Sequence, residues 1–570
     1  MASSWLSSWS PINSFPSYHG PYDVGTVDVE LPASDLPAPS TAPQDAPATI
    51  AFRIFYPCVK PTTDDSRPVR WIPQPQKLTT AALLKFLGMR EKTAGFTSHL
   101  TQHLYWINLQ AYRNAELLTP PTSNHRWPVT CFSHGLAGSR NAYSYICGDM
   151  ASNGMIVIAL DHRDGSSPVQ YIRATADTEA RVVNTVKISH EPTKEVFKAR
   201  DTQLRIRLWE MSMAFEALMK IDAGQDVENL DQNTSKRRQE RVEVLRQFDS
   251  KLDIQRAGKV TWAGHSFGAA TTVQLVKSIY YANERPTTAG KPLILPKADA
   301  AILHQIVPES PVILFDLWGL PLKSPDQAFL WDRPLPCYSA GGPQGHNVLS
   351  VLSEGFHNWN DNLNINKHIM EEPSRSRRPS EAPRITREKG KMLPSWARLK
   401  DHSPSRDSGY VSQTSQSPAQ SLNRQASDDS ATMTTENAAQ GSVVASKGPH
   451  MFYVERSQHF SQSDFGILFP FLARRFTKAE EPERILELNT RATIQVMREC
   501  GIEVAGGNDS EILQTQDAIR RWVSIPLNEA ESGLPNQKRP VNQISRKLSI
   551  KSVVGGGERS DRDIEPALDA

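Results

Sequence analysis

The chain has few cysteines and almost no net charge. Its 570 residues include five cysteines, an odd number, scattered without any C-x-x-C pair. This argues against a disulfide framework or a zinc site and indicates a reducing compartment. Lysine and arginine number 64 against 62 aspartates and glutamates, a formal net charge of +2. Such a balance argues against a nucleic-acid partner.

Long apolar runs are also missing. No segment approaches the roughly 20 apolar residues that a membrane span needs. The first residues have neither the basic segment nor the apolar core of a signal peptide. N-myristoylation requires glycine directly after the initiator methionine, and Ala2 stands there instead. We therefore expect a soluble protein of the cytoplasm.

The composition predicts folded and disordered parts. Hydrophobic residues make up 38% of the chain and 41 prolines are present, which is typical of a protein with sizeable disorder. Residues 19–365 and 449–525 together have the composition of one folded domain. A flexible N-terminus at 1–18, a Ser/Arg/Pro-rich insertion at 366–448 and a tail at 526–570 are predicted to be disordered.

Three serines in these arms stand three residues after an arginine. They are Ser380 and Ser427 in the insertion and Ser549 in the tail. Basophilic kinases prefer this pattern, so we expect kinases as partners at these serines. Phosphorylation would add negative charge at each of them.

Apolar patterns alternate between strands and helices. Residues 127–133 and 155–160 are short apolar runs that end in polar loops, as buried parallel strands do. Residues 49–56 alternate and stop at Pro57, which predicts an edge strand. An apolar stripe within 194–221 predicts a long helix. With further strands expected at 311–318, 348–353 and 450–455, the pattern predicts an α/β fold whose central sheet is mostly parallel and flanked by helices.

The most informative segment is Gly264-His-Ser-Phe-Gly268, which a strand-like run enters and a helix of small residues leaves. This is the G-x-S-x-G nucleophile elbow in its context of strand, sharp turn and helix. The turn presents the hydroxyl of Ser266, and the glycines remove side chains that would collide where strand and helix cross. The helix N-terminus favours developing negative charge. The segment predicts a serine hydrolase of the α/β-hydrolase fold, against the alternative of a Gly-rich packing turn.

A serine nucleophile of this kind needs an orienting acid and a base, which follow it in the chain in that order. Asp316 ends an apolar strand, where the acid is expected. His459 follows the last strand-like run and is the predicted base. Glu354, at the end of the strand after Asp316, is the alternative acid.

The oxyanion hole needs two N–H groups aimed at the oxygen that becomes negative. One belongs to the residue after the nucleophile, Phe267. The other is expected from a Gly-bearing loop after an early strand. Residues 132–140 form such a loop, and the N–H of Leu136 is the candidate. A purely structural Gly turn is the alternative.

With these residues in place, the sequence resembles the platelet-activating-factor acetylhydrolases, meaning the plasma and type II intracellular enzymes, which are calcium-independent group VII phospholipases A2. The resemblance spans roughly residues 15–365 and 449–525. It rests on the segments Gly20–Asp28, Phe132–Leu136, Ala159–Ser166, Arg200–Arg207, Gly264–Gln274, Phe315–Trp318, Ser353–Trp359 and Gln458–Phe465.

The resemblance implies Ser266 as nucleophile, Asp316 as acid, His459 as base, and the N–H groups of Leu136 and Phe267 as oxyanion hole. It implies hydrolysis of the sn-2 acetyl or short or oxidised acyl ester of phospholipids, giving a lysophospholipid and a carboxylate. Neither a metal nor an organic cofactor is implied. This sequence departs from the family in lacking both the secretion and the myristoylation signal, and in the insertion between acid and base.

Two alternatives stay open. One is a general carboxylesterase or dienelactone-hydrolase-like enzyme acting on soluble esters, and the other is a non-catalytic scaffold whose arms bind partners. A membrane-facing surface would favour the phospholipid hydrolase. Residues 98–113 carry apolar side chains on one helical stripe, which suits an interfacial helix and predicts peripheral membrane contact. A helix packed on the sheet is the alternative.

Overall fold

The computed structural model describes residues 14–62, 67–86, 104–284, 291–372, 448–470, 474, 479–514 and 519–527. All of them belong to one structural unit, residues 1–527. Most of the expected insertion and tail lies outside the described residues, and so do Ser380, Ser427 and Ser549.

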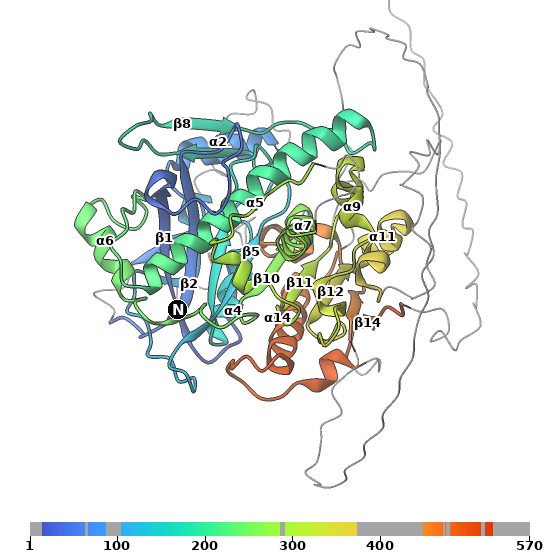
Figure 1. The fold of residues 1–570 in the computed structure, drawn as a ribbon. Helices are drawn as coiled ribbons and strands as arrows, with labels where there is room; N and C mark the ends of the chain where they lie inside the picture. Colours follow the sequence, from blue (N-terminus) through green and yellow to red (C-terminus); the bar gives the residue numbers. More distant parts are fainter. Residues whose placement is uncertain are drawn as a thin grey trace, which may run out of the picture. The chain divides into compact units, whose positions relative to one another are not determined.

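A twelve-stranded sheet occupies the centre of this unit (Figure 1). Its order is β14-β13-β12-β11-β10-β5-β6-β2-β1-β4-β3, with β9 paired to β5 beside this path. The strands are β1 Asp23–Pro32, β2 Thr49–Cys58, β3 Pro68–Arg70, β4 Asn108–Arg113, β5 Trp127–Ser133, β6 Ile156–Leu160, β9 Leu252–Asp253, β10 Thr261–His265, β11 Val312–Phe315, β12 Val348–Ser353, β13 His450–Val454 and β14 Trp522–Ser524, and a separate hairpin pairs β7 Val169–Ile172 with β8 Arg181–Asn184.

The six neighbouring strands from β13 to β6 run parallel, whereas β2 is antiparallel to both β6 and β1. Every residue of β5, β6 and β10 is buried, which explains why these strands are mostly apolar in the sequence. Although β5 precedes β6 in the chain, β6 lies between β2 and β5. This order, in a mostly parallel sheet with helices on both faces, confirms the predicted α/β-hydrolase fold.

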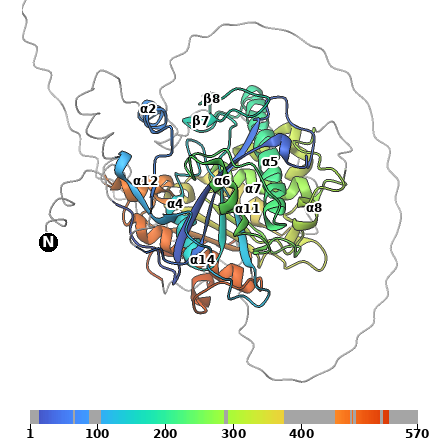
Figure 2. The same ribbon diagram turned by 90° about the vertical axis from the view of Figure 1, so that its left-hand side faces the viewer.

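Helices cover both faces of the sheet. Figure 2 shows α5, α7 and α8 on one side and α4, α12 and α14 on the other. The predicted long helix is α5, which the Thr193 hydroxyl caps by accepting a hydrogen bond from the N–H of Val196. The helices are α2 Gln76–Phe86, α4 Ser144–Ser152, α5 Lys194–Asp222, α6 Arg238–Arg246, α7 Phe267–Tyr280, α8 Ile302–Gln305, α9 Ala328–Trp331, α10 Glu354–His357, α11 Asn360–Met370, α12 Asp464–Leu468 and α14 Pro482–Glu499, and the 3₁₀ turns are η1 Ala33–Asp35, η3 Leu320–Lys323, η4 Pro325–Gln327, η5 Pro336–Tyr338, η7 His459–Gln462 and η8 Ser510–Leu513.

The core is divided by the sheet into two hydrophobic clusters. Successive side chains of a strand point to opposite faces. Accordingly Cys131 of β5 joins the cluster that includes residues of α5 and α7, and the next residue, Phe132, joins the cluster that includes residues of α4 and α14. The two layers hold the carboxyl ends of the parallel strands in fixed positions.

Residues 49–56 were predicted to form an edge strand, and this prediction is wrong. β2 lies between β1 and β6 and continues through Pro57. The alternating pattern misleads because its polar position, Arg53, is buried. Its guanidinium forms two hydrogen bonds, of 2.7 and 2.9 Å, with Asp28 on β1. A buried arginine that is paired with a carboxylate gives the same alternating sequence pattern as an arginine exposed to water.

The helix predicted over residues 98–113 is also wrong from residue 108 onward, although residues 104–106 are helical. Residues 98–103 lie outside the described residues, and residues 108–113 form β4. Along β4 exposed and buried residues alternate at first, so the period is two rather than 3.6. The apolar residues fit both periods, and pairing with β1 and β3 selects the strand.

Two expected boundaries need correction. The insertion was expected to begin at residue 366, but α11 continues to Met370, where Ile369 and Met370 are buried. At the N-terminus, Phe15 lies within the segment expected to be flexible, yet its ring is buried and stacks on Tyr145 at 6.5 Å between centroids. Apolar side chains that reach the core order these short stretches.

Among the described residues, no helix has the length and apolarity to cross a membrane.

Candidate active site

Ser266 stands on the turn between β10 and α7, with φ of 58° and ψ of −119°. A positive φ is strained for serine and requires support from its surroundings. A Cβ on Gly264 would lie 2.4 Å from the carbonyl oxygen of Gly268, and one on Gly268 would lie 2.0 Å from that of Ser133. Both positions therefore accept only glycine, and the predicted elbow is present.

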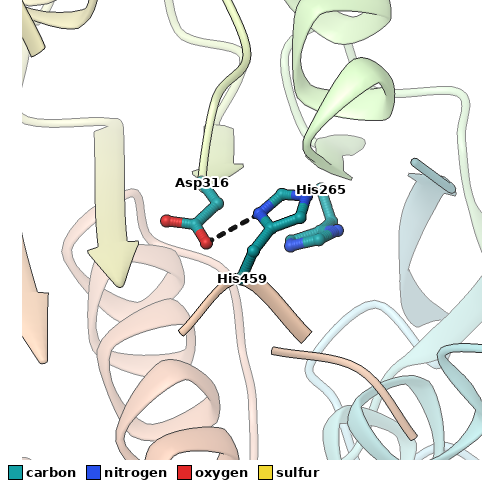
Figure 3. Close-up of side chains that lie close together, drawn as sticks. All are labelled: His265, Asp316 and His459. Carbon is teal, nitrogen blue, oxygen red and sulfur yellow. Dashed lines mark hydrogen bonds and ion pairs between the residues drawn. The ribbon is translucent and has the colours of Figure 1, made fainter. Parts of the chain in front are cut away.

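His459 connects the serine to the acid. Its Nε2 lies 2.9 Å from the hydroxyl oxygen of Ser266, and its Nδ1 lies 2.9 Å from a carboxylate oxygen of Asp316. Figure 3 shows His459 and Asp316 facing each other from the loops that follow β13 and β11. All three residues are buried. The structure thus brings together the nucleophile, base and acid that the sequence predicts.

The carboxylate of Asp316 is held by the strand next to it. It accepts hydrogen bonds from the backbone N–H of Ser353 at 2.5 Å and from the Ser353 hydroxyl at 2.7 Å. The alternative acid, Glu354, accepts a hydrogen bond from the backbone N–H of Arg456 instead. No hydrogen bond or ion pair joins Glu354 to His459 among the described residues. The geometry therefore favours Asp316.

Burial sets the charge states of this pair. Removal from water raises the pKa of Asp316 to about 6, with the Ser353 hydrogen bonds opposing the rise. Burial lowers the pKa of His459. Near neutral pH the carboxyl is therefore ionised and the imidazole is neutral, so His459 can accept a proton from Ser266 while Asp316 stabilises the imidazolium that forms.

The two expected oxyanion donors flank the nucleophile. Phe267 follows Ser266 as the first residue of α7, where backbone N–H groups lack helical acceptors. Leu136 follows Gly135, and a Cβ on Gly135 would lie 2.9 Å from the Cβ of Ser266. Within the part of the chain that the structure describes, neither N–H group has a hydrogen-bond acceptor. Both are free to bind an oxyanion.

Arg207 supports both sides of this hole, a role that its sequence position on a helix did not indicate. Its fully buried guanidinium donates to the carbonyl oxygen of His134 at 2.7 Å and lies 4.4 Å from the ring centroid of Phe267. The same group pairs with Asp164 at 2.7 Å and donates to the Ser166 hydroxyl at 2.6 Å. The Arg200–Arg207 and Ala159–Ser166 segments of the family resemblance therefore meet here.

A pocket with a cavity volume of about 80 Å³ borders the oxyanion loop, which contributes Ala137, Ser139 and Arg140 to its lining. One part of its lining is apolar and includes Trp71, Leu83 and Phe465. Another part is polar and includes Arg140 and Arg163. The lining also includes Asp161 and Glu30, which pair with these arginines. The two kinds of lining suit a molecule with an apolar and a polar part.

His265, Asp316 and His459 offer ligand atoms within 4.8 Å of one another, a set that could hold a metal ion. The sequence spacing did not indicate this cluster, because its members come from three segments that are far apart in the chain. The hydrogen bonds of His459 to Asp316 and Ser266 already use both of its ring nitrogens. The arrangement therefore fits a nucleophile, base and acid better than a metal site.

Comparisons with known proteins show which proteins this chain is similar to. The family described as "Platelet-activating factor acetylhydrolase, isoform II" matches residues 8–328, a range that contains Ser266 and Asp316 and ends before His459. A Schizosaccharomyces pombe protein named "Putative phospholipase A2" is 27% identical over 528 residues, covering 90% of this chain and 97% of that protein.

The "Platelet-activating factor acetylhydrolase" of Cavia porcellus is 31% identical over 264 residues, covering 45% of this chain and 51% of that enzyme. Among solved structures, a ferulic acid esterase from Streptomyces cinnamoneus covers 90% of this chain and 98% of its own at 13% identity and a TM-score of 0.37, too low to support any argument. Because the family match covers more than half of the chain, this protein belongs to the platelet-activating factor acetylhydrolase isoform II family.

Proposed function

We propose that this protein is a serine esterase that hydrolyses the sn-2 ester of phospholipids carrying an acetyl, short or oxidised acyl group. The observation that carries the proposal is the chain of hydrogen bonds from Ser266 through His459 to Asp316, each 2.9 Å long. Family membership supports a phospholipid ester as substrate. The pocket beside the oxyanion loop, with apolar and charged linings, suits an amphipathic substrate.

The mechanism is acyl transfer. His459, oriented by Asp316, takes the proton of Ser266 as the serine oxygen attacks the sn-2 carbonyl. The N–H groups of Leu136 and Phe267 stabilise the tetrahedral oxyanion. His459 then gives the proton to the departing lysophospholipid, and water hydrolyses the acyl-enzyme by the same steps in reverse. No step requires a metal or an organic cofactor.

The substrate class is tested by assaying the purified full chain on three esters, each with and without a chelator. They are a phosphatidylcholine with an sn-2 acetyl group, one with an sn-2 palmitoyl group, and p-nitrophenyl acetate. We expect kcat/KM to fall steeply from the acetyl to the palmitoyl lipid, without any effect of the chelator. Hydrolysis of p-nitrophenyl acetate alone would indicate a general carboxylesterase. Loss of activity in chelator that calcium restores would contradict the proposed mechanism.

We further propose that the protein acts in the cytoplasm and touches membranes peripherally. All five cysteines are unpaired, which supports a reducing compartment. Trp106 is 69% exposed and lies beside Arg70, whose guanidinium is 4.7 Å from the indole centroid. Tryptophan is common at membrane interfaces. Loss of vesicle binding in Trp106→Ser would support this contact, and unchanged binding would count against it.

Phosphorylation of Ser380, Ser427 and Ser549 by basophilic kinases is also proposed, from the preceding arginines alone. Mass spectrometry of the protein isolated from its own cells would test each position. Absence of phosphate from all three would rule the proposal out.

A further inference from the structure

The imidazole of His459 lies between two aromatic rings. Phe356 stacks on one of its faces, with 4.3 Å between centroids and planes 7° apart. His265 stacks on it as well, at 4.4 Å and 29°. Figure 3 shows His265 beside His459 and Asp316. His265 is the residue directly before the nucleophile, and its side chain is buried. The mechanism described above gives this histidine no role.

His265 is linked to the oxyanion loop through Tyr143. The phenol oxygen of Tyr143 lies 2.8 Å from Nδ1 of His265 and accepts a hydrogen bond of 3.2 Å from the backbone N–H of Gly135. Because that oxygen accepts from Gly135, its own hydrogen is available for the lone pair of Nδ1. Assigning the Tyr143 hydroxyl as the donor in this bond makes His265 the neutral tautomer with its hydrogen on Nε2.

Tyr143 is itself tied to the segment that carries His459. Asp464, five residues after His459, accepts hydrogen bonds of 2.9 Å from the backbone N–H groups of Ser144 and Tyr145. The backbone N–H of Asp464 donates to the carbonyl oxygen of Ala142, also at 2.9 Å. These bonds fix the position of the Tyr143 backbone relative to the loop of the base.

The charge of His265 matters because His459 becomes an imidazolium during the reaction. A second cation at stacking distance would oppose that change. Burial first, and then the neighbouring His459, lower the pKa of His265 far below its usual value, while Asp316 raises it. Among the described residues, Asp316 and His459 act on the charge of His265 and Tyr143 is bonded to it. With His265 neutral, the carboxylate of Asp316 is free to compensate the charge of His459.

We propose that Tyr143 and His265 are positioning residues that hold the His459 ring and the oxyanion loop in one fixed arrangement. Tyr143 binds Gly135, the residue before the oxyanion donor Leu136, and also orients His265 against the base. The pair thereby links the group that moves the proton to the group that stabilises the oxyanion. This inference rests on the proposed esterase function.

The test is the pH profile of kcat/KM on p-nitrophenyl acetate for the full-length Tyr143→Phe variant. Removal of the hydroxyl keeps the buried ring and deletes both hydrogen bonds. We expect kcat to fall about 10- to 100-fold at neutral pH with little change in KM, because the reacting groups are displaced slightly. Tyr145→Phe, the same change two residues later on α4, is the matched control and should keep wild-type kinetics.

A purely structural role would lower activity equally at every pH. Loss of the donor to Nδ1 should instead let His265 take up a proton as the pH falls. On the acid side, the kcat/KM of Tyr143→Phe should then begin to fall at a higher pH than that of the wild type. It should also fall by about hundredfold instead of about tenfold per pH unit, since two protons now bind. The double variant Tyr143→Phe/His265→Gln has a non-titrating amide there and should return to a tenfold slope.

Wild-type kinetics in Tyr143→Phe, or a loss without change in the acid limb, would overturn the proposal. Should Tyr143→Phe fail to fold, as judged by its melting temperature, the kinetics of the single variant His265→Gln test the proposal instead. It retains an acceptor for Tyr143 but lacks the stacked ring, so unchanged kcat would overturn the proposal and a reduced kcat with unchanged KM would support it. Labelling of wild-type Ser266 by a fluorophosphonate tests the esterase function separately, because it does not depend on these variants.

Discussion

Nε2 of His459 lies 2.9 Å from the hydroxyl oxygen of Ser266, although 193 residues separate them in the chain. Ser266 follows β10 and His459 follows β13, two strands of the same parallel run. The carboxyl ends of parallel strands meet at one edge of a sheet, so residues after different strands can form one site. The strand order, rather than the length of chain between the strands, therefore sets this distance.

Asp316→Asn should lower kcat by about 10⁴-fold, because an amide no longer selects the tautomer of His459 that can accept the serine proton. Glu354→Gln is the control, since the Glu354 carboxylate bonds to the backbone of Arg456 and not to His459. Steady-state kinetics on p-nitrophenyl acetate measures both. A larger loss in Glu354→Gln than in Asp316→Asn would assign the acid to Glu354.

Activity should fall on the acid side as the pH passes through about 6. Asp316, whose pKa burial raises to about 6, takes up a proton there and can no longer stabilise the imidazolium. The lowered pKa of His459 keeps the ring neutral in the same range. A profile of kcat/KM against pH should therefore give one apparent pKa near 6 for the pair and a plateau above about pH 7. Activity unchanged down to about pH 4 would contradict this assignment.

Lys277→Met should stabilise the protein, most strongly at neutral pH and below. Burial lowers the pKa of Lys277 from 10.5 to about 7, with Asp332 opposing the change. Among the described residues, its amine donates a hydrogen bond of 3.1 Å to the carbonyl oxygen of Leu330. Between these two pKa values the unfolded chain binds the proton and the folded chain does not, so the unfavourable contribution of Lys277 shrinks as the pH rises. The advantage of the variant should fall by about 2 kcal/mol between about pH 7 and 9.

Urea unfolding of wild type and variant at the two pH values measures this difference, with the exposed Lys297→Met as the control. A stability difference that does not change with pH, or a variant less stable than wild type at pH 7, would contradict the assignment of a neutral, poorly compensated amine to Lys277.

Replacing residues 373–447 by a linker of about 10 Gly/Ser residues should leave kcat on a soluble ester unchanged. The sequence predicts that this stretch cannot bury enough apolar surface to fold, and a shorter connection closes with less loss of entropy. The matched variant, which removes 366–447, should be unstable. It deletes the buried Ile369 and Met370 and the hydrogen bond of 3.0 Å from Asn366 to the carbonyl oxygen of Leu317, next to Asp316. An inactive 373–447 variant would mean that the insertion belongs to the catalytic unit.

The parts of the site that could be predicted are those whose signal lies within a short segment of the sequence. The elbow around Ser266 depends on two glycines four positions apart, so a short segment contains the whole signal. His459 and Asp316 could be placed because each ends an apolar run in the order that the fold requires. The bond of Tyr143 to His265 joins residues 122 positions apart, without any pattern that relates them, and only the structure reveals it.

The errors in the fold have a similar cause. Arg53 made β2 resemble an edge strand because a sequence does not show that a buried Asp28 pairs with it. The helix expected at residues 98–113 satisfied helical spacing, but residues 108–113 pair with β1 and β3 instead. In both cases the partner strand, which is distant in the chain, decides the structure.

The most direct test of the account is labelling of the full chain with a fluorophosphonate, with peptide mapping and with hydrolysis of sn-2-acetyl phosphatidylcholine followed in parallel. We expect one label per chain, on Ser266, and a loss of hydrolysis in proportion to labelling. Ser266→Ala and His459→Ala should each lose about 10⁴- to 10⁶-fold in kcat while keeping the melting temperature. Ser278→Ala replaces a buried serine of α7, the helix that follows Ser266, and this variant should react as wild type. Full labelling of Ser266 with hydrolysis retained, or a label on another residue, would contradict the account.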